Sequence, residues 1–265
     1  MIILDEQTYR SHPAANFSSL KTILKSPKHY QSSLKKTFEP SIEMTIGTIV
    51  HETVLEGKPY SHTVKPVDID LRTKEGKAWR DKHAGMTILS LAEHATVVRT
   101  VEAVRNSPDA QYMLNLCKQR EVGIVNNYKG VEIKGRLDAY GQDESGKPMI
   151  LDLKTTSSAD PDDFGRKVFG LKYTAQCAWY QTLLALELGL EEPPLWLWMV
   201  VETQEPHDVV FYQPPEEALE IGRAQMNRCI DTYSTCLATG NWPGYSKGVL
   251  SLDIPVWEKK KWLAT

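Results

Sequence analysis

The sequence predicts a mixed α/β (α+β) fold, in which a central mixed β-sheet is flanked by helices. Helical patterns fill about the first 118 residues, and three strand-like segments follow between residues 121 and 154. Two long helices then enclose two further strands up to residue 239. The 265 residues, of which 41% are hydrophobic and 25% charged, are enough for one domain with a sizeable core.

The N-terminal part, about residues 1–118, is expected to be helical. Residues 17–36 are typical of a basic helix that Ser18 or Ser19 caps, in which Pro27 either interrupts the helix or starts a second turn. The segment 57–85 is polar and rich in turn residues, so it is predicted to be the most flexible part. The other helices expected in this part cover residues 42–56, 88–106 and 108–118, with a break at Ser107-Pro108.

The second part, about residues 119–240, is expected to contain the sheet. The dipeptide KG and the segment GQDESGK have turn composition, so the first three strands would form two successive hairpins. Asp160-Pro161 predicts the start of a short helix, and the tail from Asn241 to WEKKKWLAT is expected to be irregular. The expected strands are 121–128, 131–140, 148–154, 195–202 and 208–213, and the expected helices are 173–189 and 215–239.

The composition argues against several classes of protein. No stretch approaches the roughly 20 apolar residues of a membrane span, and the first residues do not resemble a signal peptide, so a cytoplasmic location is expected. The net charge of −3 does not indicate a nucleic-acid binder, although a basic groove can be local. Reduced, buried thiols are expected at the four cysteines, which form no C-x-x-C pair: Cys117, Cys177, Cys229 and Cys236.

Acidic residues recur at matching positions of the three predicted strands. A hairpin centred on the GQDESGK turn would place Asp138 opposite Asp152. The preceding hairpin, with its two-residue KG turn, would place Glu121 opposite Asp138. Because side chains alternate along a strand, Lys154 would point the same way as Asp152. The sequence therefore predicts three carboxylates and a lysine on one face of the sheet.

Opposed like charges destabilise a sheet unless a carboxyl pKa rises or a cation binds. Hard oxygen ligands favour Mg²⁺, with Mn²⁺ as the alternative. A divalent ion there would polarise a phosphodiester and lower the pKa of a water, and Lys154 would orient or deprotonate that water. A D-x-K triplet by itself is more often a solvated strand face, so the prediction depends on the strand register.

With these residues the chain resembles the PD-(D/E)XK nuclease superfamily, whose signature is an Asp, a spacer and (D/E)-x-K on the next strand. Here Asp138 precedes Asp152-Leu153-Lys154, and KGRLDAY…MILDLKTT is similar to the exonuclease VIII (RecE-type) and lambda exonuclease branch. The resemblance implies a restriction-endonuclease-like core and covers about residues 18–180. Three further patches belong to it: Gly47-x-x-x-His51, Gln176-x-x-x-Tyr180 and FSSLKTILKSPKHY.

The resemblance also implies roles for individual residues. Lys154 would act on the nucleophilic water, with Gln176 and Tyr180 in the catalytic set, and Ser18 would contact a terminal phosphate. Two Mg²⁺ or Mn²⁺ ions per site are expected. Without the resemblance, His51 would be interpreted as a core histidine and Gln176 and Tyr180 as the polar edge of a helix. The implied metal ligands are Asp138, Asp152, the Leu153 carbonyl, His51 and, as a less regular position, Glu121.

Basic residues suggest where DNA would lie. Lys21, Lys25 and Lys28 on the predicted N-terminal helix could contact phosphates, although a solvated helix face explains such a run equally well. A second basic group could form a DNA-contacting loop and comprises Arg72, Lys74, Lys77 and Arg80. Trp196 and Trp198 are expected in the sheet core rather than under a base.

The expected function is that of a metal-dependent exodeoxyribonuclease, carried by a single domain spanning residues 1–265. By resemblance it would act 5′ to 3′ on double-stranded DNA ends in phage-type recombination, as a homo-oligomeric ring with a single-strand annealing protein as partner and no membrane. A structure-specific endonuclease or single-strand exonuclease would use the same site. Two other classes stay open: a non-catalytic DNA-binding or assembly module, and a carboxylate-pair sugar hydrolase, which explains neither Lys154 nor His51.

Overall fold

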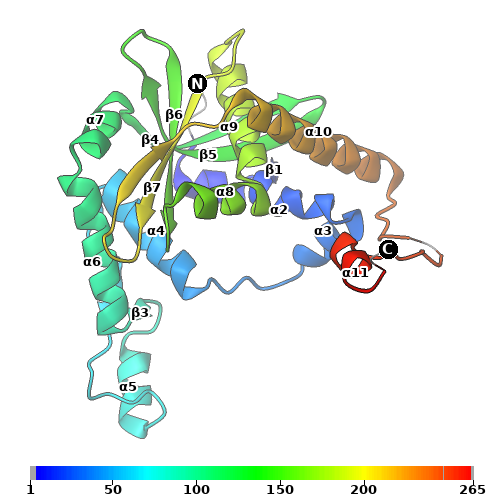
Figure 1. Ribbon diagram of the computed structural model, residues 1–265. Coiled ribbons are helices and arrows are strands. Elements are labelled where there is room, and N and C mark those ends of the chain that lie inside the picture. The colour runs from blue at the N-terminus through cyan, green and yellow to red at the C-terminus, as the bar shows by residue number, and fades with distance from the viewer. Residues whose placement is uncertain (1–3, 247, 264–265) are drawn as a thin grey trace.

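The computed structural model describes residues 4–246 and 248–263, and a mixed sheet of six strands lies at its centre (Figure 1). The strands are β1 (Ala15–Asn16), β4 (Gln119–Tyr128), β5 (Val131–Gln142), β6 (Pro148–Thr156), β7 (Leu195–Glu202) and β8 (Val209–Tyr212). Their order is β1-β5-β6-β7-β8, with β4 on the other edge of β5. β4, β5 and β6 form an antiparallel meander, β7 runs parallel to β6, and β8 is antiparallel to β7. The predicted fold class is therefore confirmed.

The two hairpins of the meander have the register that their turns predicted. Ala139 pairs with Leu151, as expected for a turn within GQDESGK. Lys129 and Gly130 have positive φ values of 52° and 78°, the backbone that two-residue hairpin turns favour. The β4–β5 ladder continues from this turn in the expected register. Turn chemistry alone therefore aligned the three strands correctly.

β5 and β6 separate at the point where the acidic residues lie. Their ladder ends one step before Asp138 would pair with Asp152. β1 pairs with the first part of β5 on the same edge as β6, so in the described part of the chain residues 135–138 have no strand partner on that edge. The backbone N–H of Leu153 instead donates to Asp138 Oδ2 over 2.8 Å. The predicted row of opposed carboxylates is broken between Asp138 and Asp152, because the strands diverge there.

Helices cover both faces of the sheet (Figure 1). The helices are α9 (Tyr173–Leu188) and α10 (Glu216–Thr239) on one face, and α4 (Ile42–Leu55), α6 (Leu91–Asn106) and α7 (Pro108–Leu116) on the other. Side chains along β6 point alternately to the two faces of the sheet. Ile150 therefore lies in the core beneath α9, whereas Leu151 and Leu153 lie in the core beneath α4. Asp152 and Lys154 share the parity of Ile150 and so point toward the α9 face.

The expected N-terminal helix over residues 17–36 is divided. Pro27 occupies the first turn of a new helix, and the Ser26 hydroxyl accepts from the His29 N–H and caps it. A separate helix precedes β1, and another, α8, begins at Pro161 as predicted. The elements are α1 (Glu6–Ser11), α2 (Phe17–Leu20), a 3₁₀ turn (Lys21–Leu24), α3 (Pro27–Ser33) and α8 (Pro161–Gly170).

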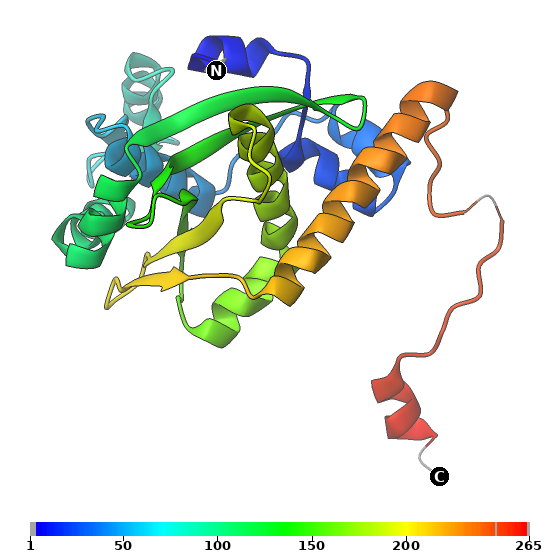
Figure 2. The ribbon, with the colours of Figure 1, turned by 90° about the horizontal axis from the view of Figure 1, so that it is seen from above.

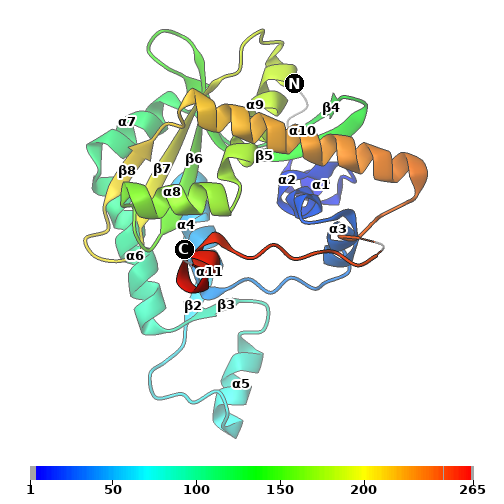
Figure 3. The same ribbon diagram turned by 45° about the vertical axis from the view of Figure 1, so that its right-hand side comes forward.

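The segment 57–85, which the sequence predicts to be polar and rich in turns, contains regular structure. The short strands β2 (His62–Val64) and β3 (Thr87–Leu89) pair in parallel, and α5 (Lys74–Lys82) lies between them in sequence. We call residues 57–90 the lobe; Figures 1 and 3 show α5 projecting from the body beyond the first turns of α4. The sequence did not predict these elements, because three-residue strands and a polar helix have too few apolar positions to show a period.

The tail after α10 is extended and ends in a helix, α11 (Val256–Trp262), where an irregular tail was expected. Figure 2 shows this tail running away from the rest of the chain, and the last two residues of WEKKKWLAT lie outside the described residues. All four cysteines are buried and free, as predicted. Among the described residues, no helix is both long enough and apolar enough to cross a membrane.

Candidate active site

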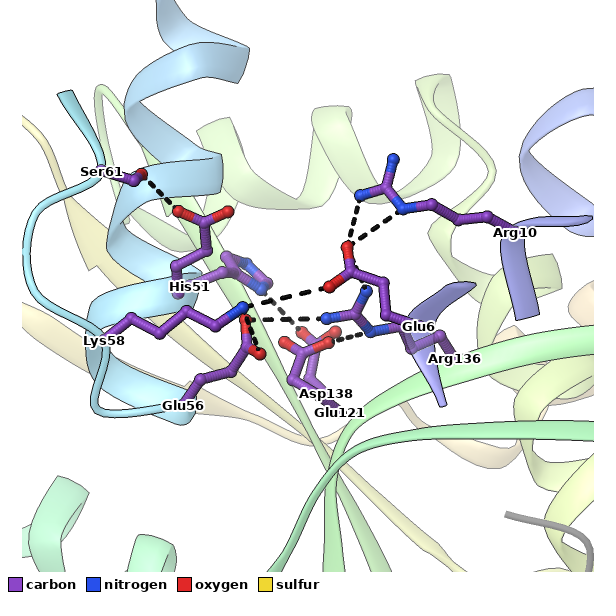
Figure 4. A network of polar contacts seen from close by, with 10 residues as sticks. Glu6, Arg10, His51, Glu56, Lys58, Ser61, Glu121, Arg136 and Asp138 are labelled. Carbon is purple, nitrogen blue, oxygen red and sulfur yellow. Dashed lines mark hydrogen bonds and ion pairs between the residues drawn. The ribbon is translucent and has the colours of Figure 1, made fainter. Parts of the chain in front are cut away.

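Three side chains with metal-ligating groups meet where β5 leaves β6. His51 comes from α4, Glu121 from β4 and Asp138 from β5 (Figure 4). One ligand atom from each lies within 4.8 Å of the other two. His51 Nδ1 is 3.6 Å from Asp138 Oδ2. The structure thus brings together three of the residues that the sequence assigned to a metal site.

Local backbone features place Glu121 and His51. Glu121 has a φ of 50°, so it leaves the ladder although the residues on either side stay paired with β5. A non-glycine residue in this left-handed region costs on the order of 1 kcal/mol, and such strain is concentrated at functional sites. Gly47 lies one helical turn before His51, and a Cβ there would be 3.0 Å from Thr155 Oγ1. Gly47 therefore allows α4 to approach β6 closely.

Arg136 is the centre of a charged network beside the three ligands (Figure 4). Its Nε lies 2.5 Å from Glu121 Oε2. Its two terminal nitrogens lie 3.5 Å from a carboxylate oxygen of Glu6 and 3.6 Å from one of Glu56. The planar guanidinium can hold several carboxylates in a fixed geometry. Arg136 therefore connects Glu121 to α1 and to the C-terminal end of α4.

The sequence reasoning missed this network. Arg136 stands two residues before Asp138 on β5, so side-chain alternation was a signal that could have found it. Glu6 and Glu56 carry no such signal, because α1 and the end of α4 meet the sheet only through the tertiary fold. Lys58, which lies 2.8 Å from Glu56, was missed for the same reason.

Asp152 is 1% exposed and forms an ion pair with the Lys154 ammonium group. Apart from that ion pair, neither carboxylate oxygen has a hydrogen-bond partner within the described residues. Lys154 Nζ also lies 4.9 Å from the centre of the Tyr173 ring at the start of α9. Over the described ranges, Asp152 is not part of the group formed by His51, Glu121 and Asp138. Lys154 lines the cleft in which that group lies, whereas Asp152 is not among the described residues that line it.

Burial and neighbouring charges shift the pKa values of the site. Burial and then the Asp138 charge raise the pKa of Glu121 to about 7. Burial and then the Lys154 charge lower the pKa of His51 to about 4, so its imidazole is neutral and able to bind a metal. Burial raises the pKa of Asp152 to about 6. Burial would lower the pKa of Lys154, but the Asp152 and Asp138 carboxylates outweigh it and hold this pKa above its ordinary value.

Gln176 and Tyr180, one turn apart on α9, lie at different depths. Gln176 lines the cleft, and Tyr180 is hydrogen-bonded to it. The Tyr180 ring packs on β5 at Gly135, where a Cβ would be 2.8 Å from Tyr180 Cε1. Trp179 anchors the same helix by donating from Nε1 to the Lys134 carbonyl over 3.0 Å. Tyr180 is therefore not among the described residues that line the cleft, and it reaches the cleft through its hydrogen bond with Gln176.

The group of three lies in a cleft of about 600 Å³. Ser18 and Lys21, two of the predicted DNA-contacting residues, line this cleft. Lys25 and Lys28 are not among the described residues that line it. Arg72 belongs to the lobe and pairs with an aspartate two residues earlier at 2.7 Å. Of the predicted DNA-contacting residues, the structure thus brings Ser18 and Lys21 to the site.

The residues present suit a divalent cation. The set offers one neutral imidazole and two carboxylates, and the Leu153 backbone, which is hydrogen-bonded to His51, lies beside them. Carboxylates buried together cost free energy unless a proton or cation offsets their charge. Oxygen donors favour Mg²⁺, whereas imidazole is better suited to Mn²⁺, so the donor set does not select one metal.

A mixed sheet flanked by helices, with Asp138 on one strand and Asp152-x-Lys154 on the next, defines a protein of the PD-(D/E)XK nuclease superfamily. A family model described as a PDDEXK-like domain of unknown function (DUF3799) matches residues 16–252. The chain therefore belongs to that family. This membership supports nuclease activity, with DNA as the substrate that the fold implies and a divalent metal as the usual cofactor of such nucleases.

Comparison with solved structures agrees on the fold. The crystal structure of a "Putative exonuclease" from Eubacterium rectale has a TM-score of 0.62 and 14% identity, covering 97% of this chain and 98% of its own. SSO0001 has a TM-score of only 0.32 and 16% identity, covering 71% of this chain and 86% of its own. No curated protein matches the chain.

Proposed function

We propose that this protein is a metal-dependent exodeoxyribonuclease that hydrolyses phosphodiester bonds from the ends of double-stranded DNA. The observation that carries the proposal is the grouping of His51, Glu121 and Asp138 within 4.8 Å, in a cleft that Lys154 also lines. This arrangement offers a cation site and a fixed positive charge at the same point. A carboxylate-pair sugar hydrolase would need neither the histidine nor the lysine.

His51, Glu121, Asp138 and the Leu153 carbonyl would hold the cation, which when bound supplies Lewis acidity toward a phosphate oxygen and a water. The buried Asp152 would add a further carboxylate if two ions bind. Lys154 stays an ammonium group because its pKa is raised, so it orients the attacking water and offsets charge on the phosphate. In that form it cannot take the proton of the water, which has to pass to another base as the P–O bond to the leaving nucleotide breaks.

We propose Mg²⁺ as the working ion, with Mn²⁺ as the alternative. We also propose that residues 1–265 act as one nuclease domain of the RecE-type and lambda exonuclease branch. Degradation would run 5′ to 3′ in phage-type recombination, within a homo-oligomeric ring and with a single-strand annealing protein as partner. The resemblance of the motifs supports this finer assignment. A ring suits a chain of net charge −3, because enclosure retains a polyanion without a strongly basic surface.

Linear duplex labelled at the 5′ or the 3′ end, compared with closed circular duplex, tests the proposal. With Mg²⁺ present, we expect digestion of linear DNA and release of the 5′ label first. Lys154→Ala should lower the rate roughly 10²–10³-fold, because charge stabilisation at the phosphate is lost. The control Lys147→Ala alters an exposed lysine in the β5–β6 turn and should leave the rate unchanged.

Other outcomes select the other candidate functions. Equal cutting of circular duplex indicates a structure-specific endonuclease, and digestion restricted to single strands indicates a single-strand exonuclease. A wild-type protein that binds duplex but cleaves no DNA with either metal would be a non-catalytic DNA-binding or assembly module.

A further inference from the structure

The lobe carries four cationic side chains on α5. Lys74, Lys77 and Arg80 follow one another at intervals of three residues along α5, with Asp81 one turn after Lys77. Lys82, at the end of the helix, points to another side of it. None of the four has an ion-pair partner among the described residues. Like charges spaced in this way destabilise a helix unless an anion binds them.

The lobe holds these cations in a fixed orientation. The Thr73 hydroxyl caps α5 by accepting from the Gly76 N–H over 3.0 Å. A Cβ at Gly76 would lie 2.0 Å from the Asp70 carbonyl oxygen, so the first turn of α5 is packed against the preceding loop. At the base of the lobe, His62 Nε2 and His94 Nδ1 lie 2.8 Å apart and join β2 to α6. The cations are therefore presented on a braced element.

The cleft by itself is poorly suited to attract a polyanion. Its lining includes six carboxylates, which are Glu6, Glu43, Glu52, Glu56, Glu121 and Asp138. Only four side chains of lysine or arginine line it, which are Arg10, Lys21, Arg136 and Lys154. Arg136 is already engaged by three of those carboxylates. Affinity for DNA has to come largely from cations outside the cleft, because phosphate contacts dominate that affinity.

We propose that the lobe is a second DNA-contacting element, in which Lys74, Lys77, Arg80 and Lys82 bind backbone phosphates of duplex DNA whose end lies in the cleft. α5 projects from the body on the side where the first turns of α4 line the cleft, so a duplex leaving the cleft there can pass along it (Figures 1 and 3). The contacts are to phosphates and read no base sequence. This inference rests on the proposed function, since it assumes that duplex DNA is the substrate.

Binding without cleavage tests the lobe. The quadruple variant Lys74→Gln, Lys77→Gln, Arg80→Gln and Lys82→Gln keeps helix-forming side chains and removes only charge. The control Arg105→Gln and Lys118→Gln removes exposed charges at the opposite end of α6 and beyond α7. Fluorescence anisotropy with labelled linear duplex in EDTA gives Kd over a range of salt concentrations. Circular dichroism and Tm establish that each variant is folded.

We expect the lobe variant to bind at least 10-fold more weakly at moderate salt. The slope of log K against log salt should be smaller by roughly 3–4, or about 0.9 for each phosphate that the variant no longer neutralises. The control should match the wild type. A folded lobe variant with the wild-type Kd and salt slope overturns the lobe proposal, and the proposed function stands if the wild type still digests linear duplex. A wild type that neither binds nor digests duplex overturns both.

Discussion

At the residue scale, Glu121 combines a strained backbone, a close arginine and a shifted pKa. Its left-handed φ of 50° takes it out of the ladder, and its carboxylate meets Arg136 at 2.5 Å. Burial and Asp138 nevertheless raise its pKa to about 7. About half of the molecules then carry a proton on Glu121 at pH 7 before metal binds.

Metal binding at pH 7 should therefore release about half a proton from Glu121, because the cation takes the carboxylate form. Because the pKa of Glu121 is about 7, the number of protons that metal binding releases should fall as the pH rises above about 7. At higher pH the Glu121 carboxyl group has already lost its proton. His51, with a pKa of about 4, contributes none at neutral pH. Calorimetric titration with Mn²⁺ in buffers of different ionisation enthalpy, at pH 7 and pH 8.5, measures the release.

Glu121→Gln supplies the control for this titration. The amide cannot lose a proton, so the variant should bind Mn²⁺ more weakly and with almost no proton release at pH 7. The same proton release in wild type and variant would assign the titrating group to another residue.

At the element scale, α9 carries Gln176 and Tyr180 and is held by α10 across a close crossing. A Cβ at Gly222 of α10 would lie 2.2 Å from the Thr174 carbonyl oxygen on α9, so only glycine fits there. We expect Gly222→Ala to lower the free energy of unfolding by about 1–3 kcal/mol or more, because backbone atoms have to move. Denaturant unfolding measures this change.

Gly165→Ala on α8 is the matched substitution, because nothing lies within 4 Å of a Cβ there. It should be neutral or stabilising by up to about 1 kcal/mol, since alanine favours a helix more than glycine does. A Gly222 variant as stable as the Gly165 variant would contradict the close crossing of α9 and α10.

The sequence predicted some elements of the fold correctly and did not predict others. The two hairpins were aligned correctly because Lys129-Gly130 and GQDESGK fix their registers locally. The lobe was missed because β2 and β3 are three residues each and pair across more than twenty residues of chain. Parallel pairing of that kind depends on interactions that no local pattern records.

At the scale of the whole molecule, a bound cation should stabilise the fold, because His51, Glu121 and Asp138 come from three separate elements. At a Mn²⁺ concentration about 100 times Kd, the stabilisation is about 2.7 kcal/mol. For a chain of this size that corresponds to a rise in Tm on the order of 5–10 °C. Differential scanning calorimetry with and without Mn²⁺ gives the shift.

The His51→Ala variant should lose most of the rise in Tm that Mn²⁺ causes, whereas the His83→Ala variant, which is changed in the lobe, should keep that rise. Equal shifts in the two variants would mean that the stabilising ion binds elsewhere on the molecule. A wild-type Tm that does not respond to Mn²⁺ or Mg²⁺ would argue against a cation site at the group of three.

The sequence by itself determined the fold class, the hairpin registers and the neighbourhood of Asp138 and Lys154, because turn residues and alternation act over a few residues. Only the tertiary structure decided that Asp152 lies apart from the group of His51, Glu121 and Asp138. Only it brought Arg136 between Glu6 and Glu56, and set α5 out from the body. Those features arise where strands diverge and distant helices meet, and there packing of the whole chain outweighs local preference.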